Sequence, residues 1–296
     1  MDVGMRRPRT ADVGDRRHDQ LHGTHLPLRT WFLAAHLMAT HSNGISALQL
    51  QAKLEIGSYK AAWLLLHKLR RAMVDPERDP LEGMIEVDET SIAYRTNDDP
   101  VAGGAGRSHD GKLLVVGAVE CKDGGRPGRI RLAVIPDFTA RTLKGFVAAS
   151  TVDGSTILTD AFSSYQGRER RMHLPKTVGV MAAHVRLPWI HRVFANLKRL
   201  ALGFYHGFRR AYLQANLDEF VFRWNRRRHH RVAFDMLPGI GLKTRPRSYD
   251  DLANPADAPE LIAGAGAVKS NAKAADLGAC NRTSVGPRRV HVLYKA

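Results

Sequence analysis

Apolar residues recur every three or four positions between residues 26 and 73, which is typical of helices. Residues 28–41, 46–54 and 58–73 each place their apolar side chains near one face. Short breaks at 42–44 and 55–57, each containing a glycine, separate them. Ser58 stands where the third helix needs an N-cap. The pattern predicts a helical unit over residues 25–75, either a helix-turn-helix or a plain three-helix bundle.

From Gly83 onward the apolar pattern changes to the two-residue period of strands. Residues 84–93, 112–120 and 129–136 read as three strands separated by Gly- and Asp-rich turns, which suggests an antiparallel meander. A helix over 139–149, a strand over 156–160 and two helices over 188–208 and 211–227 follow. The order β-β-β-α-β-α is that of an α/β, RNase H-like domain, which we expect over residues 83–232.

The two ends of the chain lack such a pattern. Residues 1–24 are rich in Arg, Asp and Gly, so we assign them no fold and expect disorder. Several prolines and glycines interrupt residues 233–296, where an irregular tail is expected. No apolar run approaches the roughly 20 residues of a membrane span, and the first 20 residues lack the apolar core of a signal peptide. The sequence therefore predicts a cytoplasmic protein with no membrane partner.

The charge is uneven along the 296 residues. The formal net charge is +16, which makes a polyanionic partner the default expectation. Residues 26–75 and 186–231 are basic, and they flank an acidic segment at 81–120. A metal-dependent enzyme acting on nucleic acid needs such a pattern, because carboxylates hold cations while basic residues neutralise phosphates. Ordinary solvated faces explain it equally well. The only cysteines, Cys121 and Cys280, form neither a disulfide framework nor a zinc site.

Two aspartates occupy strand positions where a charge is costly. Asp88 lies in the middle of strand 84–93, on the same face as Glu86, and Asp160 ends strand 156–160. A buried carboxylate needs a partner such as a cation. Two strand-borne aspartates are the minimal platform for Mg²⁺, which prefers carboxylate oxygens. For either aspartate alone, a turn or capping role is the alternative.

A third metal ligand is expected from the helix over 188–208. Asn196 falls at the rim of its apolar stripe, and 35 residues separate it from Asp160. Its carbonyl oxygen can coordinate Mg²⁺, although a neutral amide is a poorer ligand than a carboxylate. A polar surface role is the plain alternative. Glu86 and Glu219 are the reserve carboxylates.

Basic and aromatic side chains of two segments are candidates for DNA contacts. In the helix over 58–73 they lie largely off the apolar stripe, where a helix-turn-helix would read the major groove. In the two helices over 188–227 they are cations suited to phosphates, although any one alone is also explained as a solvated surface residue. The candidates are Lys60, Trp63, His67, Arg70, Arg71, Arg192, Lys198, Arg199, Arg226 and Arg227.

Several longer motifs follow one another in a specific order. They occupy residues 25–31, 45–50, 60–70, 85–90, 159–165, 191–198 and 217–227, and they include IEVDET around Asp88 and HRVFANLK around Asn196. Together they resemble bacterial insertion-sequence transposases of the ISXO2-like group, over about residues 26–250. Members of that group usually begin with a Cys-rich zinc ribbon. No Cys precedes His25 here, so no zinc is expected.

The resemblance implies an RNase H-like catalytic domain whose D-D-N or D-D-E metal site maps onto Asp88, Asp160 and Asn196. It implies two Mg²⁺ or Mn²⁺ ions, cleavage at the terminal repeats of an insertion sequence, and transfer of the 3′-hydroxyl ends to target DNA. The resemblance also implies double-stranded DNA as the partner and a homodimer or larger synaptic complex. It implies a bacterial protein that is cytoplasmic and associated with the nucleoid. Two other functions stay open: a catalytically inactive, transposase-derived DNA-binding protein, and an RNase H-like nuclease that cuts without strand transfer.

Overall fold

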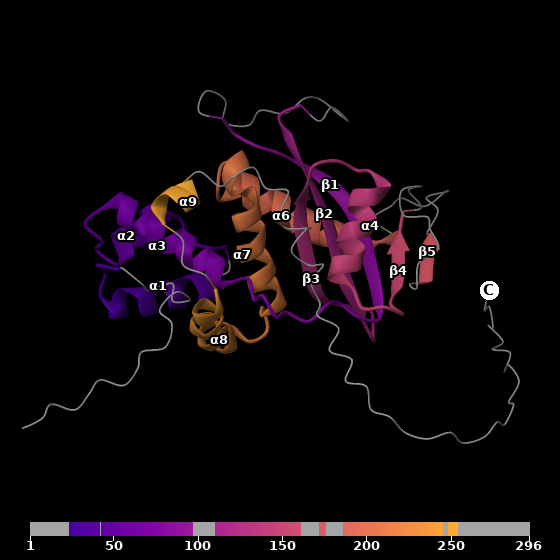
Figure 1. Ribbon diagram of the computed structural model, residues 1–296, viewed down its shortest axis with the longest axis horizontal. Helices are drawn as coiled ribbons and strands as arrows, with labels where there is room; N and C mark the ends of the chain where they lie inside the picture. Colours follow the sequence, from indigo (N-terminus) through magenta and orange to yellow (C-terminus); the bar gives the residue numbers. More distant parts are fainter. Residues whose placement is uncertain are drawn as a thin grey trace, which may run out of the picture. The chain divides into compact units, whose positions relative to one another are not determined.

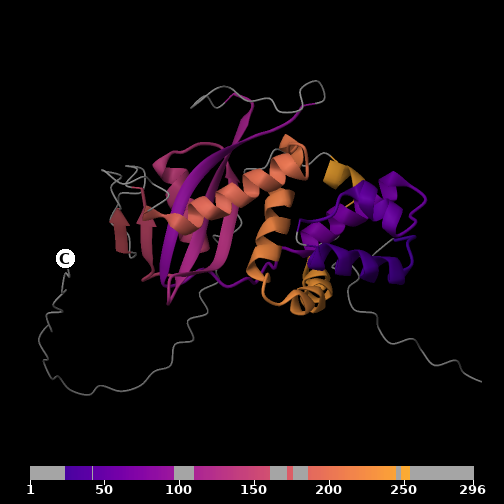
Figure 2. The ribbon, with the colours of Figure 1, turned by 180° about the vertical axis from the view of Figure 1, so that it is seen from behind.

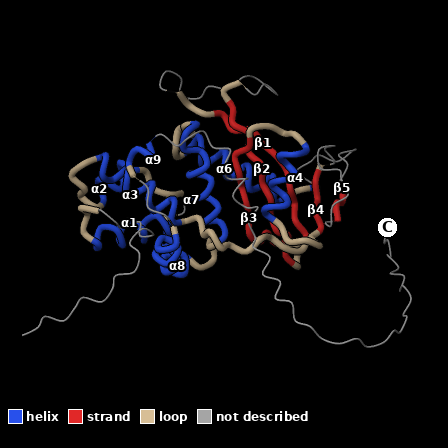
Figure 3. The backbone as a smooth tube through the Cα atoms, in the orientation of Figure 1, coloured by secondary structure: helices blue, strands red, loops and turns tan. Residues whose placement is uncertain are grey.

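The structure, a computed structural model, describes residues 24–41, 43–96, 110–160, 172–175, 186–244 and 248–253. All of these residues belong to the compact unit Met1–Ala265. Its strands gather in one sheet, and its first three helices lie apart from that sheet (Figures 1 and 3).

The sheet is mixed and has five strands in the order β3-β2-β1-β4-β5. The strands are β1 Met84–Ala93, β2 Lys112–Lys122, β3 Arg126–Ile135, β4 Thr156–Thr159 and β5 Met172–Pro175. β1, β2 and β3 form the antiparallel meander, while β4 runs parallel to β1 and β5 runs parallel to β4. The arrangement is consistent with the RNase H-like fold. The sequence did not predict β5, because a four-residue segment that ends in a proline carries little strand signal.

Helices cover both faces of the sheet. α4, Ala140–Ser150, packs against the face that carries Ile85 and Val87 of β1 (Figure 1). α6, Pro188–Gly203, crosses the opposite face (Figure 2), where Glu86 and Asp88 contact it. The alternation within β1 therefore sends its apolar side chains toward α4 and its carboxylates toward α6, as the period of two requires.

α7, Leu213–Asn225, lies along the outer edge of β3. The side-chain amide of Asn225 accepts from the Ile130 amide at 2.8 Å and donates to the Ile130 carbonyl at 3.2 Å. Gln214 accepts from the Val134 amide at 2.9 Å. An open strand edge invites pairing with other chains. α7 prevents this by supplying the missing hydrogen-bond partners.

The three predicted N-terminal helices are confirmed as α1 Leu28–Thr40, α2 Ala47–Lys53 and α3 Tyr59–Ala72. Ser46 begins α2 with a capping box that it forms with Gln49. Ser58 occupies the N-cap position of α3, but its side chain makes no capping hydrogen bond. The buried core of this helical group also includes Phe222 from α7.

The irregular tail expected from residue 233 is wrong for the residues that the structure describes there. α8 spans His230–Lys243 with Pro238 inside it, and α9 spans Tyr249–Ala253. Ala233, Leu237 and Ile240 are spaced as one helical face, and all three join the core of the N-terminal helices. Burial of this apolar face outweighs the cost of an interior proline. Residues 1–23 and 254–296 lie outside the described residues.

A buried ion network joins α3 to α7. Arg70 Nε lies 2.7 Å from Glu219 Oε2, and Arg223 Nη1 lies 3.3 Å from Glu219 Oε1. Tyr205 donates its hydroxyl to Glu219 Oε2 at 3.3 Å and accepts from Arg70 at 3.2 Å. Gly44, at a φ of 81°, passes so close that a Cβ there would lie 2.5 Å from Arg223 Nη1. A charge as buried as Glu219 is stable only with such partners.

Arg70→Met is expected to lower the free energy of unfolding by about 3–5 kcal/mol, because it removes the closest counter-ion of a buried carboxylate. Urea denaturation measures the loss. Lys243→Met is the control, since Lys243 pairs with Glu77 at the surface, and it is expected to change stability little. Equal losses in the two variants would contradict a stabilising role for the buried network.

Candidate active site

The two aspartates predicted from the sequence come together on neighbouring strands. β1 and β4 pair in parallel, with Glu86 opposite Leu158. Continuing that register by two residues places Asp160, which directly follows β4, opposite Asp88. Residues in register on adjacent strands share a face, and the charge of Asp160 acts on Asp88. The rest of the motif at 159–165, from residue 161, lies outside the described residues.

Asp88 carries the perturbed ionisation of this group. Asp88 is a buried residue with 7% of its surface exposed. Burial first, and then the neighbouring charges of Glu89 and Asp160, raise the pKa of Asp88 to about 7. The Glu89 amide, which donates to Asp88 Oδ1 at 2.9 Å, and the charge of Lys198 offset part of this rise. A nearby cation would stabilise the charged form of a carboxylate that is buried in this way.

Glu86 fixes the start of α6 over this site. One of its carboxylate oxygens accepts from the backbone amides of Trp189 at 2.8 Å and Ile190 at 2.9 Å. These first-turn amides have no partner within the helix, and the N-terminal end of the helix dipole favours the negative charge. Gly117 lies opposite Asp88 in β2, and a Cβ there would come within 2.8 Å of Ile190. The glycine therefore lets α6 approach the sheet closely beside Asp88.

His191 and Lys198 are the α6 residues on the Asp88 side. His191 Nε2 lies 3.6 Å from Asp88 Oδ2, and the charge of Lys198 reaches the same carboxylate. The two are seven positions apart, which is about two turns, so they share one flank of the helix. Sequence reasoning missed His191, although this seven-residue spacing beside the apolar stripe was a usable signal.

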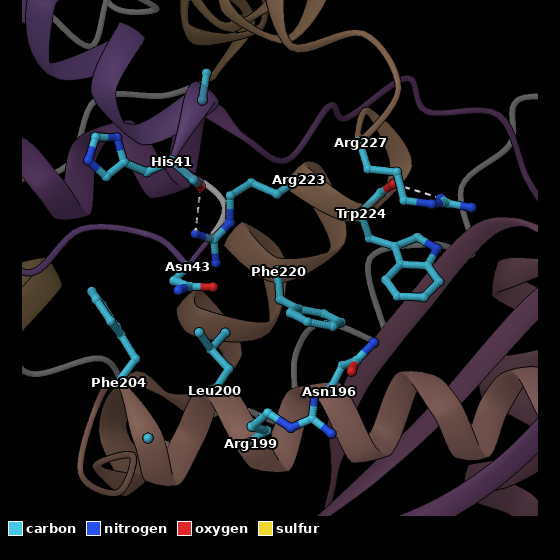
Figure 4. A pocket seen from close by; sticks show the side chains of 12 residues that line it. His41, Asn43, Asn196, Arg199, Leu200, Phe204, Phe220, Arg223, Trp224 and Arg227 are labelled. Atoms are coloured by element: carbon cyan, nitrogen blue, oxygen red, sulfur yellow. Dashed lines mark hydrogen bonds between the residues drawn. The ribbon is translucent and has the colours of Figure 1, made fainter.

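The structure does not bring Asn196 to the aspartates. Five residues beyond His191, it lies about 140° around the helix at roughly 100° per residue. Its side chain lines a separate cavity together with Arg199 and Leu200 (Figure 4). The expected third ligand thus occupies the opposite flank of α6 from Lys198. The misplacement arises because the apolar stripe has two rims, and a sequence does not reveal which rim faces β1.

The reserve carboxylates are both engaged in holding the fold. Glu86, 2% exposed, anchors α6, and Glu219 is enclosed by Arg70, Arg223 and Tyr205. Within the described ranges, no three His, Cys, Asp or Glu side chains come close enough to form a preassembled metal cage. Asp88 nevertheless has His191 beside it and Asp160 near enough for its charge to act on it, and carboxylates and an imidazole are donor types that suit a divalent cation.

The predicted DNA-reading face of α3 is largely covered. His67 and Arg70 are 5% and 4% exposed, so the expectation that they contact DNA is wrong for both. Arg70 binds Glu219. His67 stacks on Trp63 at 4.1 Å between ring centroids, and burial together with the charge of Arg70 lowers its pKa to about 3. Arg71 and Trp63 are half-buried, and only Lys60 of the five predicted residues is exposed.

The predicted cations of α6 and of the end of α7 differ in their availability. Arg192, Lys198 and Arg199 are exposed on α6. Arg227 donates to the carbonyls of Pro127 and Trp224 at 2.7 and 2.8 Å, while Arg226 stacks on the Phe222 ring at 4.0 Å. Arg227 therefore ties the end of α7 to β3, while Arg226 packs back on α7 itself. α6 presents the freer cationic surface.

Comparison with known proteins gives one match. Residues 80–225 match the family model of the ISXO2-like transposase domain. No curated protein and no solved structure matches the chain. None of the described helices is long and apolar enough to cross a membrane.

Asp88→Asn is expected to stabilise the metal-free protein more at pH 8 than at pH 5. The folded state holds the Asp88 proton up to about pH 7, whereas the unfolded chain releases it near its ordinary value. The free energy of unfolding of the native protein therefore falls as pH rises through this window. About three pKa units correspond to a gain of at most about 4 kcal/mol at pH 8.

Urea denaturation in EDTA at both pH values measures this gain. Asp123→Asn, at an exposed position in the β2–β3 turn, is the control and is expected to show no comparable increase. A gain for Asp88→Asn that is independent of pH would contradict the elevated pKa.

Proposed function

The chain belongs to the ISXO2-like transposases, and from this premise we propose that it cleaves DNA at the terminal repeats of an insertion sequence and joins the freed 3′-hydroxyls to target DNA. The family match supports transposase function in general, with DNA as the substrate. The finer proposal is supported by the register of β1 and β4, which puts Asp160 opposite Asp88 when it is continued by two residues, and by the effect of the Asp160 charge on Asp88. Paired strand carboxylates are suited to metal-dependent phosphoryl transfer.

Asp88, Asp160 and His191 would hold the divalent cations, Mg²⁺ or Mn²⁺. We infer His191 as the third ligand because it lies beside Asp88, whereas Asn196 lies on the other flank of α6. The bound cations supply charge for the scissile phosphate and favour a deprotonated water or 3′-hydroxyl nucleophile. Burial disfavours the charged form of Asp88, and a bound cation would stabilise that form.

The neighbouring residues position the site and the DNA. Glu86 holds the first turn of α6, and with it His191, against β1. Lys198 lies close enough to act on Asp88 electrostatically and is exposed, so it can neutralise a phosphate that enters beside the aspartates. Arg192 would extend this contact along the strand of DNA.

Recognition of the element ends is proposed for the helical group of α1, α2 and α3. With His67 and Arg70 buried, the exposed cations of these helices that suit phosphate contacts are Arg29 in α1, Lys53 at the end of α2 and Lys60 at the start of α3. This keeps a helix-turn-helix docking but moves the contact away from the middle of α3. Two ends must be joined in one complex, so at least two copies of the chain are proposed to assemble on DNA.

The inactive, DNA-binding alternative draws on one observation, the lack of a preassembled three-ligand cage among the described residues. Footprinting in EDTA with no nicking at any Mg²⁺ or Mn²⁺ concentration would favour it. A strand-transfer assay with pre-cleaved ends separates a transposase from a nuclease that only cuts.

Asp88→Asn and Asp160→Asn are each expected to reduce cleavage below detection in Mg²⁺ or Mn²⁺, because each removes a proposed metal-binding carboxylate. The substrate is a duplex carrying the inverted repeats that flank the coding sequence. Asp153→Asn, an exposed aspartate just before β4, is the matched control and is expected to retain cleavage. Cleavage that persists in both active-site variants would overturn the assignment.

His191→Ala is expected to weaken Mn²⁺ binding on the order of tenfold or more, since it removes an imidazole ligand. Electron paramagnetic resonance of bound Mn²⁺ should show coupling to an imidazole nitrogen in the native protein and none in this variant. Asn196→Ala is expected to leave both the affinity and the coupling unchanged. The opposite outcome, with loss of Mn²⁺ affinity only in Asn196→Ala, would restore the amide as the third ligand.

A further inference from the structure

A cavity of about 640 Å³ lies between α6, α7 and the residues that follow α1. Asn43 enters it from the α1 side, Asn196 and Arg199 from α6, and Phe220 and Trp224 from α7 (Figure 4). None of the described residues that line it is acidic. Its volume lies in the range of small-molecule sites, roughly 300–1,000 Å³.

Two side-chain amides of this cavity have no hydrogen-bond partner among the described residues. They belong to Asn43 and Asn196, which lie on different sides of the cavity (Figure 4). A side-chain amide presents both donors and an acceptor. Two such groups around one space suit a ligand whose edge carries donors and acceptors of its own, as a nucleobase does.

The α7 wall offers a fixed aromatic surface. Trp224 donates its indole N–H to the Gly128 carbonyl at 3.2 Å, and the Arg227 guanidinium lies 4.6 Å from its ring centroid. Phe220 is buried beside it, with ring centroids 6.1 Å apart. Rings held in this way can pack against a base without first becoming ordered, and base–aromatic contact is tolerant of sequence.

Positive charge completes the set. Arg199 is exposed at the rim, whereas Arg223, which also lines the cavity, is already paired with Glu219. With no carboxylate in the lining, the cavity favours an anion. The cavity therefore combines an aromatic wall, two side-chain amides and a cationic rim. This combination suits the binding of a planar polar ring attached to a phosphate.

We propose that this cavity binds an unstacked nucleotide of the DNA strand, with Asn43 and Asn196 against the base edge, Trp224 and Phe220 against the base, and Arg199 against the phosphate. The proposal rests on the proposed DNA-processing function and names a second contact for the same substrate. Asn196 and Arg199 follow His191 on α6 by about 8–12 Å along the axis, at 1.5 Å per residue. A few nucleotides span that distance.

Binding of short single-stranded probes in EDTA tests the proposal. The probes are a fluorescent five-residue deoxycytidine oligonucleotide and the same oligonucleotide with abasic sites, which keeps the phosphates and removes the bases. The native protein is expected to bind the base-bearing probe at least about fivefold more tightly, because the two amides hold the base edge so that its ring packs against the aromatic wall. The double variant Asn43→Leu, Asn196→Leu is expected to lose that preference.

Two further variants keep the test independent of folding defects. Asn196→Asp preserves the side-chain shape and is expected to weaken binding of both probes, because its charge repels the phosphates. Arg199→Ala is expected to weaken both probes about equally, while Arg141→Ala, an exposed arginine on α4, leaves them unchanged. Equal affinity of the native protein for the two probes, or a base preference that survives in the double leucine variant, would overturn the proposal.

The outcome is separable from that of the catalytic proposal. EDTA prevents metal-dependent cleavage, so the binding preference does not depend on activity. If the base preference holds and the protein never cuts DNA, the cavity proposal stands and the proposed transposition falls. If cleavage requires Asp88 and Asp160 but the bases make no difference to binding, the reverse conclusion follows.

Discussion

The hydrogen bonds from the first amides of α6 to the Glu86 carboxylate are the interaction on which the candidate active site depends. Glu86 lies two residues before Asp88 on the same face of β1, so anchoring the helix there brings its first turn to Asp88. The buried carboxylate is satisfied by backbone donors and the positive end of the helix dipole. Gly117 provides the complementary constraint, because a Cβ there would lie within 3 Å of the Ile190 and Phe194 side chains of α6, which would have to move.

α7 connects this sheet to the helical core. One side of it supplies hydrogen bonds to the edge of β3 through Asn225 and Gln214. On another side of α7, Phe222 packs into the core of α1, α2 and α3. Glu219 of α7 also pairs with Arg70 of α3. A carboxylate that resembles a reserve metal ligand in the sequence is therefore part of the connection between two cores. Breaking such a buried pair leaves an uncompensated charge, which couples the two cores energetically.

The sequence predicts the sheet better than it predicts the helices around the site. Strict alternation determines β1 to β3 and places Asp88 on the face of Glu86, because a period of two leaves only two faces. α8 was not predicted because Pro238 is a strong local signal against a helix. Burial of Leu237 and Ile240 in the tertiary structure outweighs that signal. His191 and Asn196 flank the same apolar stripe, and their roles depend on which flank meets β1. That choice is made by packing against Glu86 and Gly117, residues more than 70 positions away in the chain.

The two flanks of α6 make different electrostatic demands, and this accounts for the neutral residue at position 196. On the Asp88 flank, carboxylates and an imidazole suit cations, with Lys198 limiting the local negative charge. On the cavity flank, the exposed Arg199 favours phosphates, and a carboxylate at position 196 would repel a phosphate at close range. An amide there keeps hydrogen-bonding capacity without the repulsion. Asn196 is therefore a poor metal ligand for the same reason that it suits a nucleotide-binding cavity, namely that it carries no charge.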